Sequence, residues 1–487
     1  MNRKIIAAVV GVPVTVLVSA IVIATLSFSS KQVHVDEVPI DVNPIRAADR
    51  LSQLLSFETV STADFADRDH IAFVAQRAWI TVTYPTLHET LEVEAIGRAG
   101  LLYTWRGSDP TLAPIVLAAH LDVVPADDGV ASDPWQHPPF AGQQADGFVW
   151  GRGAQDDKGS ALAILEAVEG LVVAREKPKR TILIALGEDE EVFGDEGAEK
   201  IAAALRRDGV QPLFTLDEGM TVLDGVIDGV DPPVAVIGIA EKGYVSLELS
   251  ARSEGGHSSM PPPITAAGRV AAAVTRLQEQ PFPARLEGPA RAMFEHLGPE
   301  MNQPERTVMA NLWLLSPVLE RVLTKKNTTN ALLRTTTAPT MLEGSPKDNV
   351  LPQRATAVVN FRILPGDTIE SVEERVRGIV ADDAIAIRVQ PGATNPSPVS
   401  PTDGEAWTAL SRVIRGVFPE AVVAPGLVVG ATDGRHYADL GPVYRFAPFV
   451  VTPEDIPRFH GTDERISVDG LASAIVFYRQ LISETSL

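Results

Sequence analysis

The sequence predicts an α/β fold in which a mainly parallel mixed sheet is flanked by helices and carries an inserted, smaller α+β domain. Short apolar stretches that end in acidic or His residues alternate with helical segments, which is typical of a parallel sheet. A separate block instead alternates polar and apolar residues. The length of 487 residues exceeds what one hydrophobic core usually holds, so we expect at least two domains.

The N-terminus predicts a membrane anchor within residues 1–30. Residues 5–28 carry no charge and are mostly Ile, Val, Leu and Ala, so as a helix rising about 1.5 Å per residue they would cross a hydrocarbon core about 30 Å thick. Arg3 and Lys4 precede them and favour a cytoplasmic N-terminus, with the body on the extracytoplasmic side. The alternative is a cleaved signal peptide, although its apolar region is usually shorter. Residues 31–46 are interpreted as a tether.

The first part of the α/β domain is expected at residues 47–240. Strands are predicted within 113–124, 180–191 and 211–219, and helices at 158–174 and 196–207. Ligands bind beyond the carboxyl ends of the strands in such sheets. We therefore expect one site to collect the polar residues at these strand ends, namely His120, Asp122, Glu190, Glu191 and Asp217.

Residues 241–392 are predicted to form the inserted domain. The order is a strand at 243–253, a helix at 263–280, a strand at 354–364, a helix at 368–381 and a strand at 384–390, which suits a split βαβ unit. The α/β pattern resumes in 393–487, where helices are expected at 405–418 and 469–483 on either side of the strand-like segment 443–451.

The composition excludes several function classes. Acidic residues number 63 against 42 basic ones and no Lys/Arg run occurs, so nucleic acid is not an expected partner. The absence of cysteine excludes disulfides, thiolate metal sites and a cysteine nucleophile. Any metal site must therefore use His and carboxylates.

The segment "GRGAQDDKGS" (151–160) contains two adjacent carboxylates whose role has to be explained. Asp156 and Asp157 precede a predicted helix, where one of them could serve as an N-terminal cap. The motifs "HLD", "GEDEEVFG", "GGHSSMPP" and "RFHGTDERI" likewise have ordinary structural interpretations when each is taken alone. Their joint occurrence at strand ends favours a functional site instead.

A dinuclear metal centre would explain the constellation through its charges. Two divalent ions bring four positive charges, and three carboxylates with a hydroxide bring four negative ones. Mixed nitrogen and oxygen ligation suits zinc, with Co²⁺ or Mn²⁺ as possible substitutes. A carboxylate shared by two ions about 3.5 to 4 Å apart would give Asp156 its purpose. The proposed ligands are His120, Asp156, Glu191, Asp217 and His460.

From residue 47 to the end, the chain resembles the dinuclear zinc metallopeptidases that include glutamate carboxypeptidase, aminoacylase, bacterial dipeptidases and yeast carboxypeptidase S. The motifs "HLDVVP", "GRGAQDDKG", "EDEE", "LDEG", "GGHSSMPP", "NVLP", "NFRILPGD", "ATDGR" and "HGTDER" occur in the family's order. The N-terminal apolar segment, Asp217 and "WQHPPFAG" are most similar to carboxypeptidase S and the N-fatty-acyl-amino-acid hydrolase/synthase. Asp463, where Asn is common, and a longer 281–337 region depart from the pattern.

The resemblance implies a role for each matched residue. His120 and Asp217 would bind one zinc ion, Glu191 and His460 the other, and Asp156 would bridge them. Asp122 would orient His120, Glu190 would be the general base, and the peptide bond before Asp157 would be cis. On the inserted domain, His257 would donate to the oxyanion in a partner subunit's site. Arg362 and Asn349 would bind the substrate.

Together these observations predict a hydrolase with two Zn²⁺ per subunit that cleaves the amide bond next to a C-terminal amino acid, using water activated by the metal. The substrates would be small peptides or N-acyl amino acids, and the inserted domain could support a homodimer. Two alternatives stay open at this point. One is an aminopeptidase-type dipeptidase of the same family, and the other is an inactive, membrane-tethered metal-binding protein.

Overall fold

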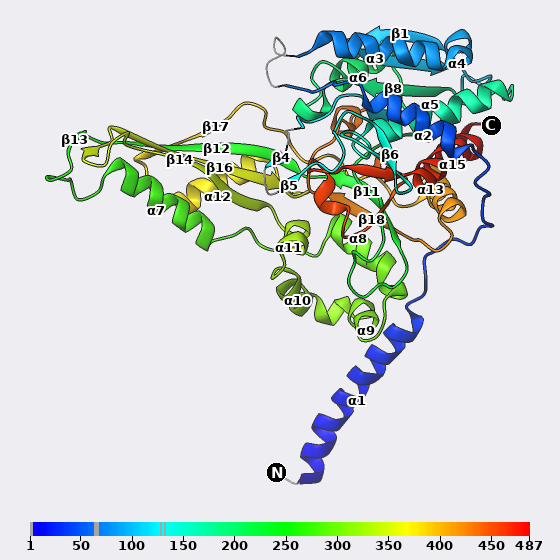
Figure 1. Ribbon diagram of the computed structural model, residues 1–487. Helices are drawn as coiled ribbons and strands as arrows, with labels where there is room; N and C mark the ends of the chain where they lie inside the picture. Colours follow the sequence, from blue (N-terminus) through cyan, green and yellow to red (C-terminus); the bar gives the residue numbers. More distant parts are fainter. Residues whose placement is uncertain (1–2, 63–67, 127–128, 131–132) are drawn as a thin grey trace.

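The computed structural model describes residues 3–62, 68–126, 129–130 and 133–487. It has a helix-covered body, an elongated second domain to one side, and the helix α1 (Arg3–Ser27) projecting away from both (Figure 1). The predicted α/β segment 47–240 includes residues 63–67, 127–128 and 131–132, which lie outside the described residues.

The body is built on a mixed ten-stranded sheet with strand order β1-β2-β8-β3-β9-β19-β11-β10-β20, and β18 also pairs with β11. The four adjacent strands β8, β3, β9 and β19 run parallel to one another, and β2 and β11 on either side of them run antiparallel. Continuous apolar runs form β3 and β8, as expected for strands buried on both faces. The strands are β1 (Glu92–Ile96), β2 (Gly100–Trp105), β3 (Ile115–His120), β8 (Ile182–Gly187), β9 (Phe214–Asp217), β10 (Val222–Leu223), β11 (Val234–Glu241), β18 (Val422–Val428), β19 (Val443–Arg445) and β20 (Val450–Val451).

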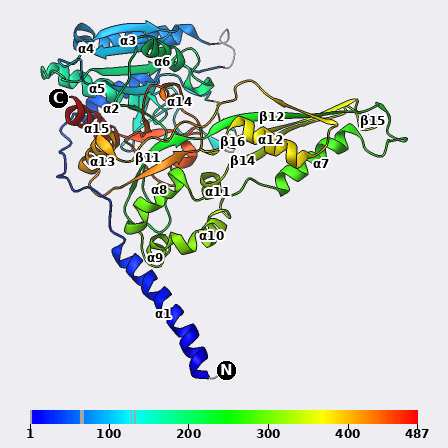
Figure 2. The ribbon, with the colours of Figure 1, turned by 180° about the vertical axis from the view of Figure 1, so that it is seen from behind.

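Helices cover both faces of this sheet. One face packs against α2 (Pro44–Leu55), α5 (Lys158–Val173), α13 (Gly404–Val417) and α15 (Val468–Ser486), whose apolar residues share one core with β3 and β8. The other face carries α6 (Ala198–Arg207) and α14 (Gly434–Tyr437), which join a smaller core. Figure 2 shows the C-terminus and α15 beside α13, on the face of the sheet that α2 and α5 also cover. The predicted α/β class is therefore confirmed as a three-layer arrangement.

The second domain has its own sheet and its own core. The strand order is β14-β16-β12-β17, backed by two helices whose apolar residues pack on it. Sequence patterning predicts every element except β14, whose mostly exposed residues give little alternation. The elements are β12 (Gly243–Arg252), α7 (Ala266–Glu279), β14 (Thr336–Glu343), β16 (Arg354–Ile363), α12 (Ile369–Val380) and β17 (Ile385–Val389).

The helices between α7 and β14 pack on the body rather than on the second domain's core. Apolar residues of α8 (Gly288–Leu297), α9 (Glu305–Ala310), α10 (Leu312–Leu323) and α11 (Asn327–Leu333) form a separate core with β11 and β18. The segment 241–392 is thus divided between two cores, which differs from a simple insert.

The N-terminal segments are docked on this part of the body. Within the residues that the structure describes, no helix is both long and apolar enough to cross a membrane; residues 1–2 lie outside them. The anchor therefore stays a prediction. Residues 31–46, interpreted as a tether, contact the body: the Gln32 side chain hydrogen-bonds both the backbone N–H and C=O of Val423, and the Val38 N–H donates to the Gly416 carbonyl.

Candidate metal centre

The ends of the parallel strands deliver the first group of polar residues. β3 ends at His120, which lies in register with Gly187 at the end of β8. The chain after β8 turns through a short 3₁₀ segment, Glu190–Val192, that carries two carboxylates. Because β3 and β8 are parallel, His120, Glu190 and Glu191 meet at one edge of the sheet.

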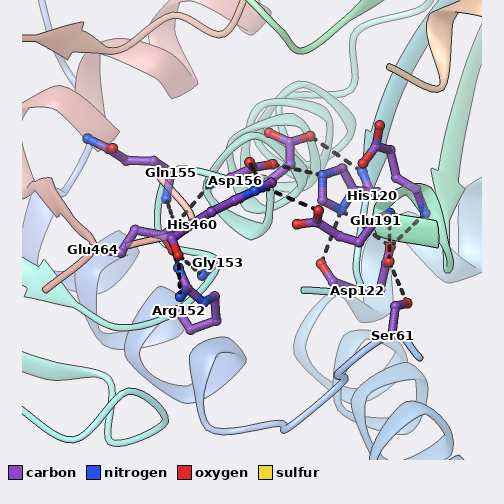
Figure 3. Close-up of polar contacts among 12 residues, drawn as sticks. Ser61, His120, Asp122, Arg152, Gly153, Gln155, Asp156, Glu191, His460 and Glu464 are labelled. Carbon is purple, nitrogen blue, oxygen red and sulfur yellow. Dashed lines mark hydrogen bonds and ion pairs between the residues drawn. The ribbon is translucent and has the colours of Figure 1, made fainter. Parts of the chain in front are cut away.

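Asp156 lies between two histidines that come from distant parts of the chain (Figure 3). Its Oδ1 is 3.0 Å from Nε2 of His120, and its Oδ2 is 3.0 Å from Nε2 of His460. Nε2 of His460 is also 3.3 Å from Oε2 of Glu191. Each oxygen of one carboxylate thus faces a different imidazole, as a carboxylate shared by two ions would require.

The sequence prediction of Asp217 as a cluster member is corrected by Glu218. Ligand atoms of Glu218, His120 and Asp156 lie within 4.8 Å of one another. Oδ2 of Asp217 instead accepts the Gly434 N–H at 2.5 Å, so this carboxylate is engaged by the backbone. The family comparison that rested on Asp rather than Glu at 217 loses its basis, since Glu218 fills that place.

Two further groupings of possible ligand atoms occur in the described part of the chain: His120 with Glu190 and Glu191, and Asp156 with Glu191 and His460. Combined with the Glu218 group, they form one continuous cluster centred on Asp156. Of the five predicted ligands, the structure brings together all but Asp217.

Asp122 is a buried carboxylate that connects two strand ends. Its Oδ1 is 3.3 Å from Nδ1 of His120, as the orienting role requires. The same carboxylate accepts the backbone N–H groups of Glu190 and Glu191 at 3.2 Å and the Ser61 hydroxyl at 2.6 Å. Asp122 thereby sets both the ring of His120 and the position of the acidic turn.

Glu464, which sequence analysis missed, holds the loop that carries Asp156. Its carboxylate accepts the backbone N–H groups of Gly153, Gln155 and Asp156 at 2.8 to 3.1 Å and pairs with Arg152 at 2.8 Å (Figure 3). The "HGTDER" motif contained the signal, since it places an acidic residue four positions after His460.

Other residues of the two motifs have structural contacts. The peptide bond between Asp156 and Asp157 is cis, as the resemblance implied. Asp157 stands at the N-cap of α5 without a side-chain cap, and its Oδ2 accepts the His120 N–H at 3.4 Å, so the capping interpretation is not supported. Asp463 accepts hydrogen bonds from the backbone and side chain of Gln136.

The electrostatics of the cluster favour cations. Burial raises the pKa of Glu190 well above its usual value, and burial with neighbouring carboxylates does the same for Glu218. Hydrogen bonds to Asp156 and Glu191 raise the pKa of His460 to about 10. Oε1 of Glu191 is buried with no hydrogen-bond partner among the described residues. The buried carboxylates outnumber the cationic groups beside them, which suits the binding of divalent cations. Such cations would take the place of protons on the carboxylates and would give the unpaired Oε1 of Glu191 a partner.

A cavity of about 370 Å³ opens beside the cluster. Asp156, Glu190, Glu218 and His460 line one side of it. The rest of the lining is largely apolar and includes Met220, Val428, Val429, Ala447, Phe449 and Phe459. A ligand here would meet the cluster and an apolar wall at once.

Three predicted residues lie outside the cluster, on the second domain. His257 and Asn349 are exposed neighbours at its outer end, where the Ser258 N–H donates to the Asn349 carbonyl and β13 (Gly256–His257) pairs with β15 (Val350–Leu351) (Figures 1 and 2). Arg362 stands at the inner end of β16, with its guanidinium 5.0 Å from the ring centroid of Tyr244.

Comparisons with known proteins show that the chain is similar to peptidases and to an amino acid synthase/hydrolase. A model of peptidase family M20/M25/M40 matches residues 116–484. N-fatty-acyl-amino acid synthase/hydrolase PM20D1 of Xenopus tropicalis is 44% identical over 398 residues, which are 81% of this chain and 77% of that protein. Carboxypeptidase S of Saccharomyces cerevisiae is 32% identical over 446 residues, covering 82% and 76%. The crystal structure of human carnosine dipeptidase 1 has a TM-score of 0.63 at 18% identity, covering 92% of this chain and 97% of that chain, and so shares the fold.

We expect Glu464→Gln to weaken divalent metal binding by about 10- to 100-fold, the usual scale for losing a residue that positions ligands. The substitution removes the charge that holds the Asp156 loop while keeping the side-chain size. Competition with a chromogenic chelator measures the affinity. Glu405→Gln, which alters a largely exposed partner of Arg180, is the control and should bind metal normally. Equal affinities in the two variants would contradict the role of Glu464.

Proposed function

Because the chain belongs to peptidase family M20/M25/M40 and is thus an enzyme that hydrolyses amide bonds, we propose that it releases a C-terminal amino acid from N-acyl amino acids or small peptides at a centre of two Zn²⁺ ions. The observation that carries this proposal is Asp156, whose two oxygens each lie 3.0 Å from a different His Nε2. Membership of an enzyme family disfavours the inactive metal-binding alternative.

The proposed ligands are those of the observed cluster. His120 and Glu218 would hold one ion, Glu191 and His460 the other, and Asp156 both, with Co²⁺ or Mn²⁺ able to replace zinc. When held by these residues, divalent ions would supply a Lewis acid for the substrate carbonyl and would lower the pKa of water toward neutrality.

Glu190 is the proposed general base. It lines the cavity beside Asp156, and Asp122 accepts its backbone N–H, which fixes its position. Within the described residues, no basic side chain forms an ion pair with its carboxylate. Glu190 takes a proton from the attacking water and returns it to the departing nitrogen as the C–N bond breaks, which yields a carboxylic acid and an amine.

Arg362 is the proposed recognition group for the substrate carboxylate. It is half-buried, burial lowers its pKa, and no carboxylate in the described part of the chain pairs with it. A forked guanidinium in this state suits a ligand carboxylate. The apolar wall of the cavity and the similarity to an N-fatty-acyl-amino acid synthase/hydrolase support an apolar acyl or side chain on the substrate.

A homodimer would give His257 and Asn349 a role. Both are exposed at the outer end of the second domain, away from their own chain's cluster. We infer that they complete the site of a partner subunit, where His257 donates to the oxyanion and Asn349 contacts the substrate.

The apolar segment of residues 5–28 supports a further proposal, that the protein is a single-pass membrane protein with its body on the extracytoplasmic side.

Two substitutions test the division of labour in the centre. Asp156→Ala should lose metal and activity together, because the shared ligand is removed. Glu190→Gln should keep about two ions per chain and lose about 10²-fold or more in turnover, the usual scale for a general base. Elemental analysis and hydrolysis of an N-acyl amino acid measure these effects. Equal metal loss in both variants would contradict the assignment.

Substrate recognition is tested by blocking the carboxylate. The wild-type enzyme should hydrolyse an N-acyl amino acid and fail on its C-terminal amide. Arg362→Ala should lower kcat/KM for the acid by about 10- to 100-fold, as expected for a hydrogen bond between charged groups. Arg354→Ala, an exposed partner of Glu248 on the same strand, is the control. Similar rates of hydrolysis of the acid and the amide would contradict carboxylate recognition and would favour the aminopeptidase-type dipeptidase instead.

Subunit mixing tests the partner role of His257. Inactive His257→Ala chains mixed with inactive Glu190→Gln chains should regain part of the activity, because a mixed dimer has one site with both groups intact. Enzyme assays before and after subunit exchange, with exchange confirmed by differently tagged chains, provide the measurement. Mixtures that exchange and stay inactive would place His257 outside the reaction.

A further inference from the structure

The helix α10 exposes an apolar face that no described part of the chain covers. Its inner residues Leu312 and Leu319 are buried in the core with β11 and β18. Its outer residues Trp313, Val318 and Val322 are 61%, 59% and 54% exposed. Leu314 and Pro317 are exposed between them, so large apolar side chains recur at helical spacing on the outward side.

We propose that this outer face of α10 is a lipid-binding surface that lies in the headgroup region of the bilayer holding α1. The inference rests on the membrane anchor in the proposed function. It adds that the body itself contacts the membrane and is therefore held in one orientation on it, rather than suspended from a flexible stalk.

The position of α1 carries this inference. The buried Asn311, directly before α10, donates from its side-chain amide to the Thr25 hydroxyl at 3.1 Å and to the Ile21 carbonyl at 3.4 Å. Arg306 donates to the Phe28 carbonyl at 2.9 Å. The last turns of α1 are thus tied to the start of α10. A bilayer that surrounds α1 must come close to α10 (Figure 1).

The exposed surface of α1 is apolar, like the outer face of α10. The described part of α1 exposes Val16, Ile23 and Leu26, and the apolar side chains of α10 extend this surface sideways. The indole N–H of Trp313 donates to Asn311, which leaves an amphipathic ring of the kind enriched at membrane interfaces.

Charge at the edge of this face also favours lipid. Arg321 in the last turn of α10 and Lys325 just beyond its end are exposed, although the whole chain carries a formal net charge of −21. An apolar face bordered by basic residues is the pattern of a helix that lies in the plane of a membrane surface. A soluble protein partner would not account for the adjacent, exposed apolar surface of α1.

The absence of cysteine allows a direct test on the full chain. Single cysteines at Val318→Cys on α10, Val18→Cys on α1 and Val82→Cys on α3 (His70–Thr83) would carry an environment-sensitive fluorophore. Val82 is 80% exposed, and α3 lies at the opposite end of the molecule from α1, so it is the matched control (Figure 1). The chains are reconstituted in phosphatidylcholine and phosphatidylglycerol vesicles with or without spin-labelled lipid.

We expect the label at 318 to shift to the blue and to be quenched by the lipid spin label at least about threefold more than the label at 82. Quenching at 18 with none above control at 318 would overturn the lipid surface while leaving the anchor intact. No quenching at 18 would overturn the anchor and this inference with it. A blue shift at 318 without lipid quenching would show that protein covers the face, which also overturns the proposal.

Discussion

The buried pair of Arg152 and Glu464 fixes the centre on which the rest of the site depends. Glu464 accepts three backbone N–H groups from the loop that ends in Asp156, while Arg152 donates to the carbonyls of His460 and Gly461. Both charged side chains are buried, and breaking such a pair costs about 3 to 5 kcal/mol because one charge is left uncompensated. Asp156 and His460, two proposed ligands that lie 304 positions apart in sequence, are therefore held at hydrogen-bond distance.

The same principle operates on the other side of the cluster. Asp122 binds the ring of His120 and the backbone of the acidic turn, so one carboxylate couples the ends of β3 and β8. These structural carboxylates add to the proposed ligand carboxylates, and burial raises the pKa of Glu191, Glu218 and Glu464. A cluster with this excess of buried negative charge is stable only with cations or protons present, which links the fold of the site directly to metal binding.

Sequence patterning predicts the strand ends well because a buried apolar run followed by a polar residue is a strong local signal. It located His120, Glu190 and Glu191 on this basis. It chose Asp217 over Glu218 because adjacent residues at a strand end point to opposite sides, and local pattern does not show which side faces the site. It missed Glu464 because a carboxylate that binds backbone N–H groups has no periodic signature. The packing of α8 to α11 on the body could not be predicted either. The apolar pattern of a helix shows that one face is buried, but it does not show which part of the protein buries it.

We propose that Asp156 is shared by two ions, with His120 and Glu218 as the other ligands of one ion and Glu191 and His460 as those of the other. A crystal structure of the zinc-loaded protein, with anomalous diffraction measured on both sides of the zinc absorption edge, tests it most directly. We expect two zinc peaks about 3.5 to 4 Å apart on either side of the Asp156 carboxylate, one of them contacting Glu218. A single peak, or a zinc ion bound by Asp217 in place of Glu218, would contradict it.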